Sequence, residues 1–331
     1  MDQVTLDYAC FLPISARLPL AWGAQLTAWR GRWCSRHDRD WRSIALGKRY
    51  VHERTFNAVK YLLDRHIYPR RQDDLESFER LNEKLLSKDA ITMTNERFVY
   101  AAYEEWQAAL IQANRLSELM FEGESSHERL PRQAVIAAMH VDSPMLGLVQ
   151  LGRWGRKLCA LSSNVVEDPR VPEPIQRFFR AKYLAMSKHW HGGRCMHKET
   201  ELAQFLRAGR DGFSLAVFCD VPGGVRAELH EKGIWTSFLG ERRLVAPAAF
   251  RIAQRLALPI VAMYCKRVTP NRYQIYFSDV FPAHDIETAS AGVYEFWSDK
   301  ILENPQAWWA SDLLDVYPTC PKKKPFEAVF K

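Results

Sequence analysis

A histidine at position 140 directly follows the apolar run 134–139. Imidazole titrates near neutral pH, so a histidine that ends a buried strand is well placed to act as a general base toward a hydroxyl or an amine. Asp142 follows two residues later and could hold the ring, as a carboxylate does in a catalytic triad. A hydrogen-bonded structural histidine and an aspartate in a turn would explain the same residues.

A second candidate site begins at Asp220, which ends the strongly apolar run 213–219 and precedes Val-Pro-Gly-Gly. Gly223 and Gly224 allow positive φ angles and a close approach of the backbone to a ligand. The loop could therefore hold a phosphate or a pantetheine arm, with Asp220, Gly223 and Gly224 as substrate contacts. A plain turn at the end of a strand is the alternative.

Segment 189–197 contains three histidines and one cysteine, which are side chains that bind zinc. Their spacing matches no closed structural zinc site, so we predict a polar loop and no metal. Lys188 and Arg194 are then candidate anion contacts near the mouth of an active site. Arg243 is a further candidate for a phosphate contact, although a solvated loop arginine is an equal alternative.

The elements around these residues alternate between strands and helices. Apolar or alternating runs predict strands, and helical periodicity predicts helices, one of them ending at Gly209 as its C-cap. The predicted strands are 134–139, 157–161, 213–219, 259–264 and 272–277, and the predicted helices are 174–188, 198–207 and 247–256. This order predicts an α/β fold with a mostly parallel central sheet flanked by helices on both faces.

Ligands of such sheets bind beyond the carboxyl ends of the strands. His140 and Asp220 each end an apolar strand, so we expect the two side chains at the same edge of the sheet. Residues 1–128 have mostly helical periodicity, and the segment 122–126 breaks it. We therefore divide the chain into an N-terminal helical region, 1–128, that packs on an α/β core, 129–331.

The chain has 331 residues and a formal net charge of +7. This excess favours an acidic partner, but the basic residues form no dense cluster with aromatic residues between them, so nucleic acid is disfavoured. The seven cysteines are irregularly spaced, which fits a reducing cytoplasm. The uncharged stretch 18–29 is too short to span a bilayer, and core packing is favoured over contact with a membrane surface.

Several segments in order resemble the lipid A late acyltransferases, a branch of the lysophospholipid acyltransferase superfamily. The segment 134–147 resembles the family's apolar strand that leads to a histidine, and 220–224 resembles its acidic residue at a strand end. The segment 238–250 resembles its block of phenylalanine, glycine and a small-residue helix, and 304–309 its proline-tryptophan motif. The resemblance covers about residues 134–310, with a fainter match at 55–58.

The resemblance implies transfer of an acyl group from a thioester of acyl carrier protein or coenzyme A to a hydroxyl or amine, with His140 as base and no cofactor. The carrier would be a protein partner, and the acceptor a small or lipid-like molecule. The acid that the family places five residues after the histidine is Met145 here. We therefore expect an acceptor other than lipid A, for example in secondary metabolism, and peripheral membrane contact at most. A non-catalytic relative that binds a carrier or a partner protein is the first alternative, and a metal-dependent hydrolase that uses the histidines of segment 189–197 is the second.

Overall fold

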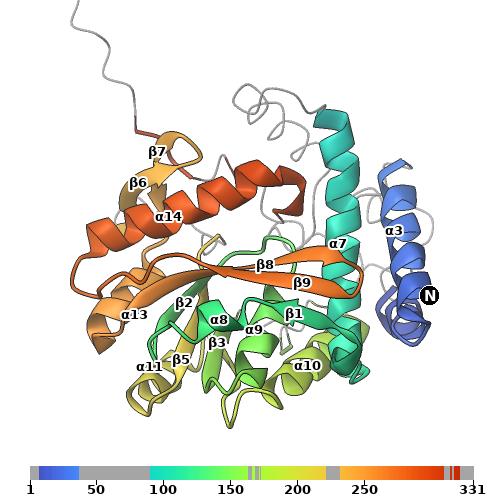
Figure 1. Ribbon diagram of the computed structural model, residues 1–331, viewed down its shortest axis with the longest axis horizontal. Coiled ribbons are helices and arrows are strands. Elements are labelled where there is room, and N and C mark those ends of the chain that lie inside the picture. The colour runs from blue at the N-terminus through green and yellow to red at the C-terminus, as the bar shows by residue number, and fades with distance from the viewer. Residues whose placement is uncertain are drawn as a thin grey trace, which may run out of the picture.

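A computed structural model describes residues 7–36, 90–162, 166–167, 171, 173–220, 232–308, 314 and 317–320 (Figure 1). The N-terminal elements are η1 (Asp7–Phe11), α2 (Leu12–Ser15), α3 (Leu20–Arg36), α7 (Ala90–Gln112) and η2 (Leu116–Glu118). The strands of the main sheet are β1 (Met120–Glu122), β2 (Val135–Ala138), β3 (Leu158–Ser162), β4 (Cys195–His197), β5 (Ser214–Phe218), β8 (Ile260–Thr269) and β9 (Arg272–Phe277). The helices between and after them are α8 (Glu124–His127), α9 (Pro144–Arg153), α10 (Glu173–Ser187), α11 (Leu202–Arg210), α13 (Ala248–Leu256), α14 (Ile286–Glu303) and η3 (Pro305–Ala307). Strands β6 (Ile234–Phe238) and β7 (Glu241–Val245) form a separate hairpin.

The seven strands have the order β1-β9-β8-β2-β5-β3-β4. All neighbouring pairs are parallel except β8 and β9, which are antiparallel. The structure confirms the predicted α/β fold with a mostly parallel sheet. The central strand β2 lies between β5 and β8, and its four residues are fully buried because helices cover both faces of the sheet.

Successive residues of a strand point to opposite faces, and β2 divides its residues between two apolar clusters in this way. Ile136 packs in a cluster with side chains of α7, α9 and α10. Val135 and Ala137 pack in a second cluster with side chains of α11, α13 and α14. Figure 1 shows α14 crossing one side of the sheet, with α9 and α10 on the other. The two clusters hold β2 rigidly at the centre of the fold.

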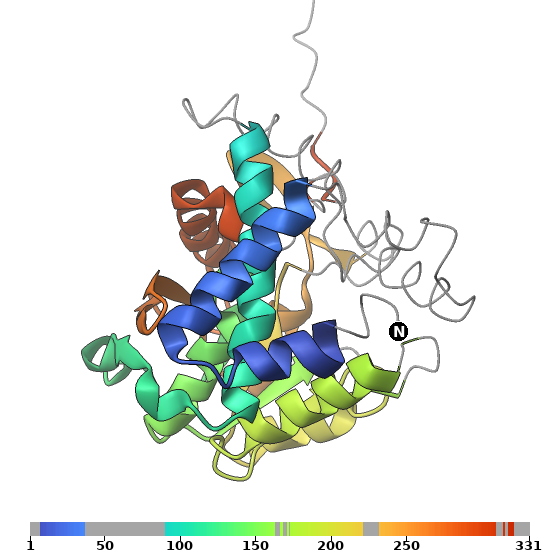
Figure 2. The same ribbon diagram turned by 90° about the vertical axis from the view of Figure 1, so that its right-hand side faces the viewer.

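The N-terminal region packs as helices, as predicted, in the part that the structure describes. Helix α3 lies alongside α7 (Figure 2), and the hydroxyl of Tyr103 on α7 donates to the carbonyl of Ala24 on α3 over 3.1 Å. At Gly31 a Cβ atom would lie 2.7 Å from Cα of Val99, so a side chain there would push the two helices apart. The fainter family match at 55–58 lies outside the described residues.

The structure corrects several sequence-based boundaries. Strand β1 lies inside the predicted helical region and adds to the sheet beside β9. Helix α11 begins at Leu202, not 198, and Gly209 lies inside it rather than capping it. A Cβ atom on Gly209 would approach Cδ1 of Leu256 to 2.6 Å, so this glycine permits close packing of α11 against α13. No helix in the described ranges is both long and apolar enough to cross a membrane.

Candidate active site

The candidate active site lies at the carboxyl ends of β2 and β5, where His140 and Asp220 meet. The strands are parallel and adjacent, and each ends two residues before its functional side chain. Nδ1 of His140 lies 2.9 Å from Oδ1 of Asp220. The structure thus confirms the expectation that both residues share one edge of the sheet.

Asp220 is fully buried, and hydrogen-bond donors surround its carboxylate. The backbone N–H of His140 donates to Oδ2 over 2.7 Å, and the indole Nε1–H of Trp308 donates to the same oxygen over 3.1 Å. The His140 ring contacts the other oxygen. A buried carboxylate needs such partners because water cannot solvate it. The three contacts fix the position of the carboxylate relative to the ring.

The His140 ring is held from a second side by Phe218, whose ring stacks on it with centroids 4.1 Å apart. Because Asp220 accepts the Nδ1 hydrogen, Nε2 is the basic nitrogen of the neutral ring. This is the arrangement that a general base requires. The side chain of His140 remains 17% exposed.

Charged neighbours set the basicity of this ring. Burial alone would lower the pKa of His140, but the charge of Asp220 and its hydrogen bond raise it, and the net effect is a pKa above the usual value. Glu104 of α7 raises that pKa further, and Lys182 of α10 lowers it. Lys182 is only 2% exposed, and its ammonium lies 5.0 Å from the ring centroid of Phe179. It is a buried cation whose charge acts on the base.

Asp142 does not hold the His140 ring in this structure, and the assignment of that role to it is corrected here. Its Oδ1 accepts from the Ser143 hydroxyl over 2.8 Å, and its Oδ2 accepts from the backbone N–H of Arg267 over 3.0 Å. The backbone of Asp142 has a φ of 60° and its N–H donates to the carbonyl of Ala307 over 2.9 Å. Burial, only partly opposed by Arg267, raises the pKa of Asp142 to about 6.

Lys188 and Arg194 precede the edge strand β4, which β3 and β5 separate from β2. Helix α10 runs back toward the start of the next strand, so Lys188, just beyond its end, lies near the amino end of the sheet. Arg194 precedes β4, forms a 2.6 Å ion pair with Glu201, and also donates to Gln204. The structure therefore brings neither residue to His140.

Arg243 holds the C-terminal part of the chain. It lies on β7, is 6% exposed, and its Nη1 donates to the carbonyls of Leu314 and Tyr317 over 3.0 and 3.3 Å. A second nitrogen contacts Glu241. These contacts give the side chain a structural role. Gly223 and Gly224 lie outside the described residues.

Two histidines of segment 189–197 have separate partners. Nε2 of His191 lies 2.9 Å from the carbonyl of Gly152, and Nδ1 of His197 lies 3.5 Å from the Ser162 hydroxyl. In the described part of the chain, no group of three or more His, Cys, Asp or Glu side chains could hold a metal ion.

Sequence reasoning missed three residues of the site: Phe218, Lys182 and Trp308. Trp308 had a signal, because it lies in the proline-tryptophan motif near the C-terminus, but nothing local indicated its bond to Asp220. Together with His140 and Asp220 these side chains form a buried base, its orienting acid and a nearby cation. Such an arrangement can remove a proton from a hydroxyl or an amine. Comparison of the sequence with models of protein families and with curated proteins finds no match.

Proposed function

We propose that this protein is an acyltransferase that moves an acyl group from a thioester of acyl carrier protein or coenzyme A to a hydroxyl or amine. The observation that carries the proposal is the contact between His140 and the buried carboxylate of Asp220 at the carboxyl edge of the sheet. The ordered family resemblance of residues 134–310 supports the choice of acyl transfer over other base-catalysed reactions.

In the proposed reaction, Nε2 of His140 takes the proton of the acceptor hydroxyl or amine. The acceptor atom then bonds to the thioester carbonyl carbon, the carbon–sulfur bond breaks, and the departing thiolate takes the proton back from His140. Asp220 stabilises the imidazolium between these steps. Lys182 lowers the pKa of His140, which keeps more of the ring in the neutral form that can accept a proton.

The proposal favours a catalytic protein over a non-catalytic relative. The alternative rested on Met145, where the family has an acid, and Asp220 supplies a carboxylate to the His140 ring from another strand. The net charge of +7 suits docking of an acidic carrier protein by electrostatic attraction. The proposal places the reaction in the cytoplasm, with peripheral contact at the inner face of the membrane at most.

The test is thioester consumption by the purified protein with a panel of acyl carrier and coenzyme A donors, followed by intact-mass analysis of candidate acceptors. We expect an acylated acceptor with the wild type and none with His140→Ala at an unchanged melting temperature. His284→Ala is the matched control, because His284 is exposed and precedes α14 near the amino end of β8. Normal turnover by His140→Ala would refute the proposal.

A further inference from the structure

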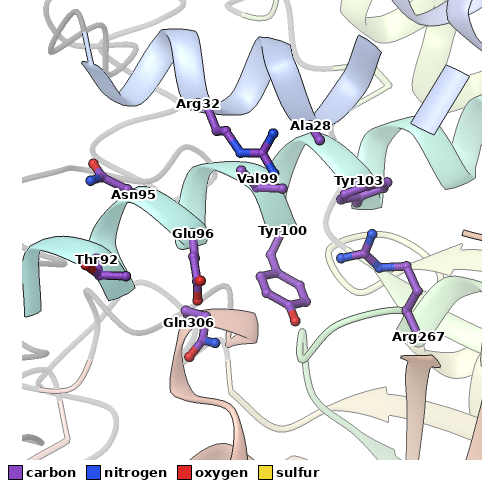
Figure 3. A pocket seen from close by; sticks show the side chains of 10 residues that line it. All are labelled: Ala28, Arg32, Thr92, Asn95, Glu96, Val99, Tyr100, Tyr103, Arg267 and Gln306. Atoms are coloured by element: carbon purple, nitrogen blue, oxygen red, sulfur yellow. The ribbon is translucent and has the colours of Figure 1, made fainter. Parts of the chain in front are cut away.

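A pocket of about 520 Å³ lies between α3, α7 and the segments that carry Arg267 and Gln306 (Figure 3). Its lining includes three charged side chains, Arg32, Arg267 and Glu96. The two arginines exceed the one glutamate by a single positive charge. Arg32 and Glu96 are exposed, whereas Arg267 is half-buried, so the charge of Arg267 is the least screened by solvent.

The guanidinium of Arg267 is held between aromatic rings, and its N–H donors have no acceptor among the described residues. The guanidinium carbon lies 3.5 Å from the ring centroid of Tyr103 and 5.2 Å from that of Tyr100. Among the residues that the structure describes, none accepts a hydrogen bond from its side-chain nitrogens, and Nε is buried without a partner. Unpaired buried donors are costly. A planar guanidinium held on an aromatic face presents its donors in a fork that matches a carboxylate or a phosphate.

Two neutral side chains extend this polar surface. Gln306 is 6% exposed, and its Oε1 is buried with no partner in the described part of the chain. The hydroxyl of Tyr100 accepts from Nδ2 of Asn304 over 2.9 Å, which leaves its own hydrogen as a donor. Figure 3 shows Glu96 and Tyr100 extending from α7 to the side on which Gln306 lies, with Arg267 next to Tyr100. The pocket therefore offers several donors and one unpaired acceptor to a polar ligand.

The pocket is joined to the His140–Asp220 pair by two short segments. The backbone N–H of Arg267 donates to Asp142, which is two residues from His140, a reach of about 7 Å along the chain. The carbonyl of Ala307, next to Gln306, accepts from the N–H of Asp142, and the following residue, Trp308, donates to Asp220. A ligand in the pocket thus lies beside the segments that carry the base and its acid.

We propose that this pocket binds an oxyanion group, a phosphate or a carboxylate, of one of the two substrates, and that Arg267 forms a bidentate contact with it. Only the naming of the two substrates rests on the proposed acyl transfer. The oxyanion belongs either to the phosphopantetheine arm of the donor or to an acidic group of the acceptor. Glu96 opposes the anion, but it is exposed, and Arg32 offsets its charge.

The test is calorimetric titration of the full-length protein with inorganic phosphate, 4′-phosphopantetheine and pantetheine at constant ionic strength. We expect phosphate to bind the wild type and to bind Arg267→Met at least about tenfold more weakly, the loss of one charge-assisted contact. Arg255→Met, a change of an exposed arginine on α13, leaves the affinity unchanged. Arg267→Lys, which keeps the charge but not the fork, loses severalfold and serves if Arg267→Met folds poorly.

The affinities for phosphopantetheine and pantetheine together identify which substrate carries the oxyanion. Tighter binding of phosphopantetheine than of pantetheine, lost in Arg267→Met, assigns the pocket to the donor. Equal binding of the two, with phosphate binding still dependent on Arg267, assigns it to the acceptor. His140→Ala should bind phosphate normally, because phosphate binding does not depend on the catalytic base. A protein that binds phosphate through Arg267 but transfers no acyl group would therefore support this proposal and contradict the proposed function. Absence of phosphate binding by the wild type, or binding that survives Arg267→Met unchanged, overturns it.

Discussion

The substitution Asp220→Asn tests the assignment of the orienting acid most directly. Oδ2 of Asp220 accepts from two donors, the His140 backbone N–H and the Trp308 indole, whereas the partner of Oδ1 among the described residues is the ring. An asparagine keeps its single oxygen toward the two donors, because its NH₂ group cannot accept from them. The NH₂ group then faces Nδ1 of His140. Nδ1 must become the acceptor, Nε2 carries the hydrogen, and the base is lost.

We expect kcat to fall by about 10³ to 10⁴, the cost of the wrong tautomer in Ser-His-Asp enzymes, which corresponds to roughly 4 to 5.5 kcal/mol of barrier height. The fold should persist, since the side-chain volume is unchanged, two of the three hydrogen bonds remain as they are and the third reverses its direction. The pH profile should also move. Asp220 raises the pKa of His140, so without its charge the ring stays neutral to lower pH. The acid limb of the residual activity therefore shifts to lower pH.

The assay is the release of thiol from the acyl donor, followed with a chromogenic thiol reagent in the presence of acceptor. Asp142→Asn is the matched control, because it makes the same chemical change closer to His140 in the sequence. We expect it to keep kcat within about tenfold, since its carboxylate bonds to Ser143 and Arg267. The assignment is refuted if Asp142→Asn loses 10³ or more and Asp220→Asn turns over normally.

Three further predictions concern the surroundings of the base. Lys182→Met should move the acid limb of the kcat profile to higher pH, because it removes a charge that lowers the pKa of His140; an unchanged acid limb would exclude that role. Burial raises the pKa of Asp142 from 3.8 to about 6, so its protonated form stabilises the fold at low pH, and this contribution is lost as the pH rises through 6. The unfolding free energy of Asp142→Asn minus that of the wild type should therefore be larger at pH 7.5 than at pH 4, by up to about 3 kcal/mol. Urea titration of both proteins at the two pH values measures this difference, and a difference that does not change with pH would contradict the reasoning. Arg243→Met should lower the melting temperature by several degrees, since it frees the carbonyls of Leu314 and Tyr317; loss of donor affinity at unchanged stability would instead support the substrate contact predicted from sequence.

The central strands were predictable because each is a continuous apolar run or a run in which apolar and polar residues alternate. The apolar runs at 134–139 and 213–219 form β2 and β5, because a strand buried on both faces requires continuous apolar residues. The alternating run forms β9, Arg272–Phe277, because partial exposure requires alternation.

The β6–β7 hairpin was missed for a physical reason. Its two-residue turn has Leu239 at φ 52° followed by Gly240 at φ 76°, and a leucine at positive φ gives none of the usual signal of such turns. Leu239 tolerates this conformation with its side chain buried and its N–H bonded to Ser298.

The partners of His140 were less predictable than the base, because they come from distant segments. Phe218 ends β5, Lys182 lies within a helix whose periodicity shows only that one side is buried, and Trp308 follows η3. The nearest acid in sequence, Asp142, was the natural candidate for orienting the ring. The hydrogen bonds of its carboxylate are to Ser143 and the Arg267 backbone. Proximity in sequence therefore indicated the wrong carboxylate.

Register explains why Asp220 reaches the ring. Ala138 pairs with Phe218 in the parallel ladder, and His140 and Asp220 each follow two residues later, so they occupy equivalent positions on neighbouring strands about 4.8 Å apart. Met145 instead lies in the first turn of α9, where it packs against the apolar cluster beneath the sheet. A carboxylate there would lose solvation without a partner from β5. The acid of this site is therefore selected by the pairing of β2 with β5, and a shift of that register by one residue would turn the Asp220 side chain to the opposite face.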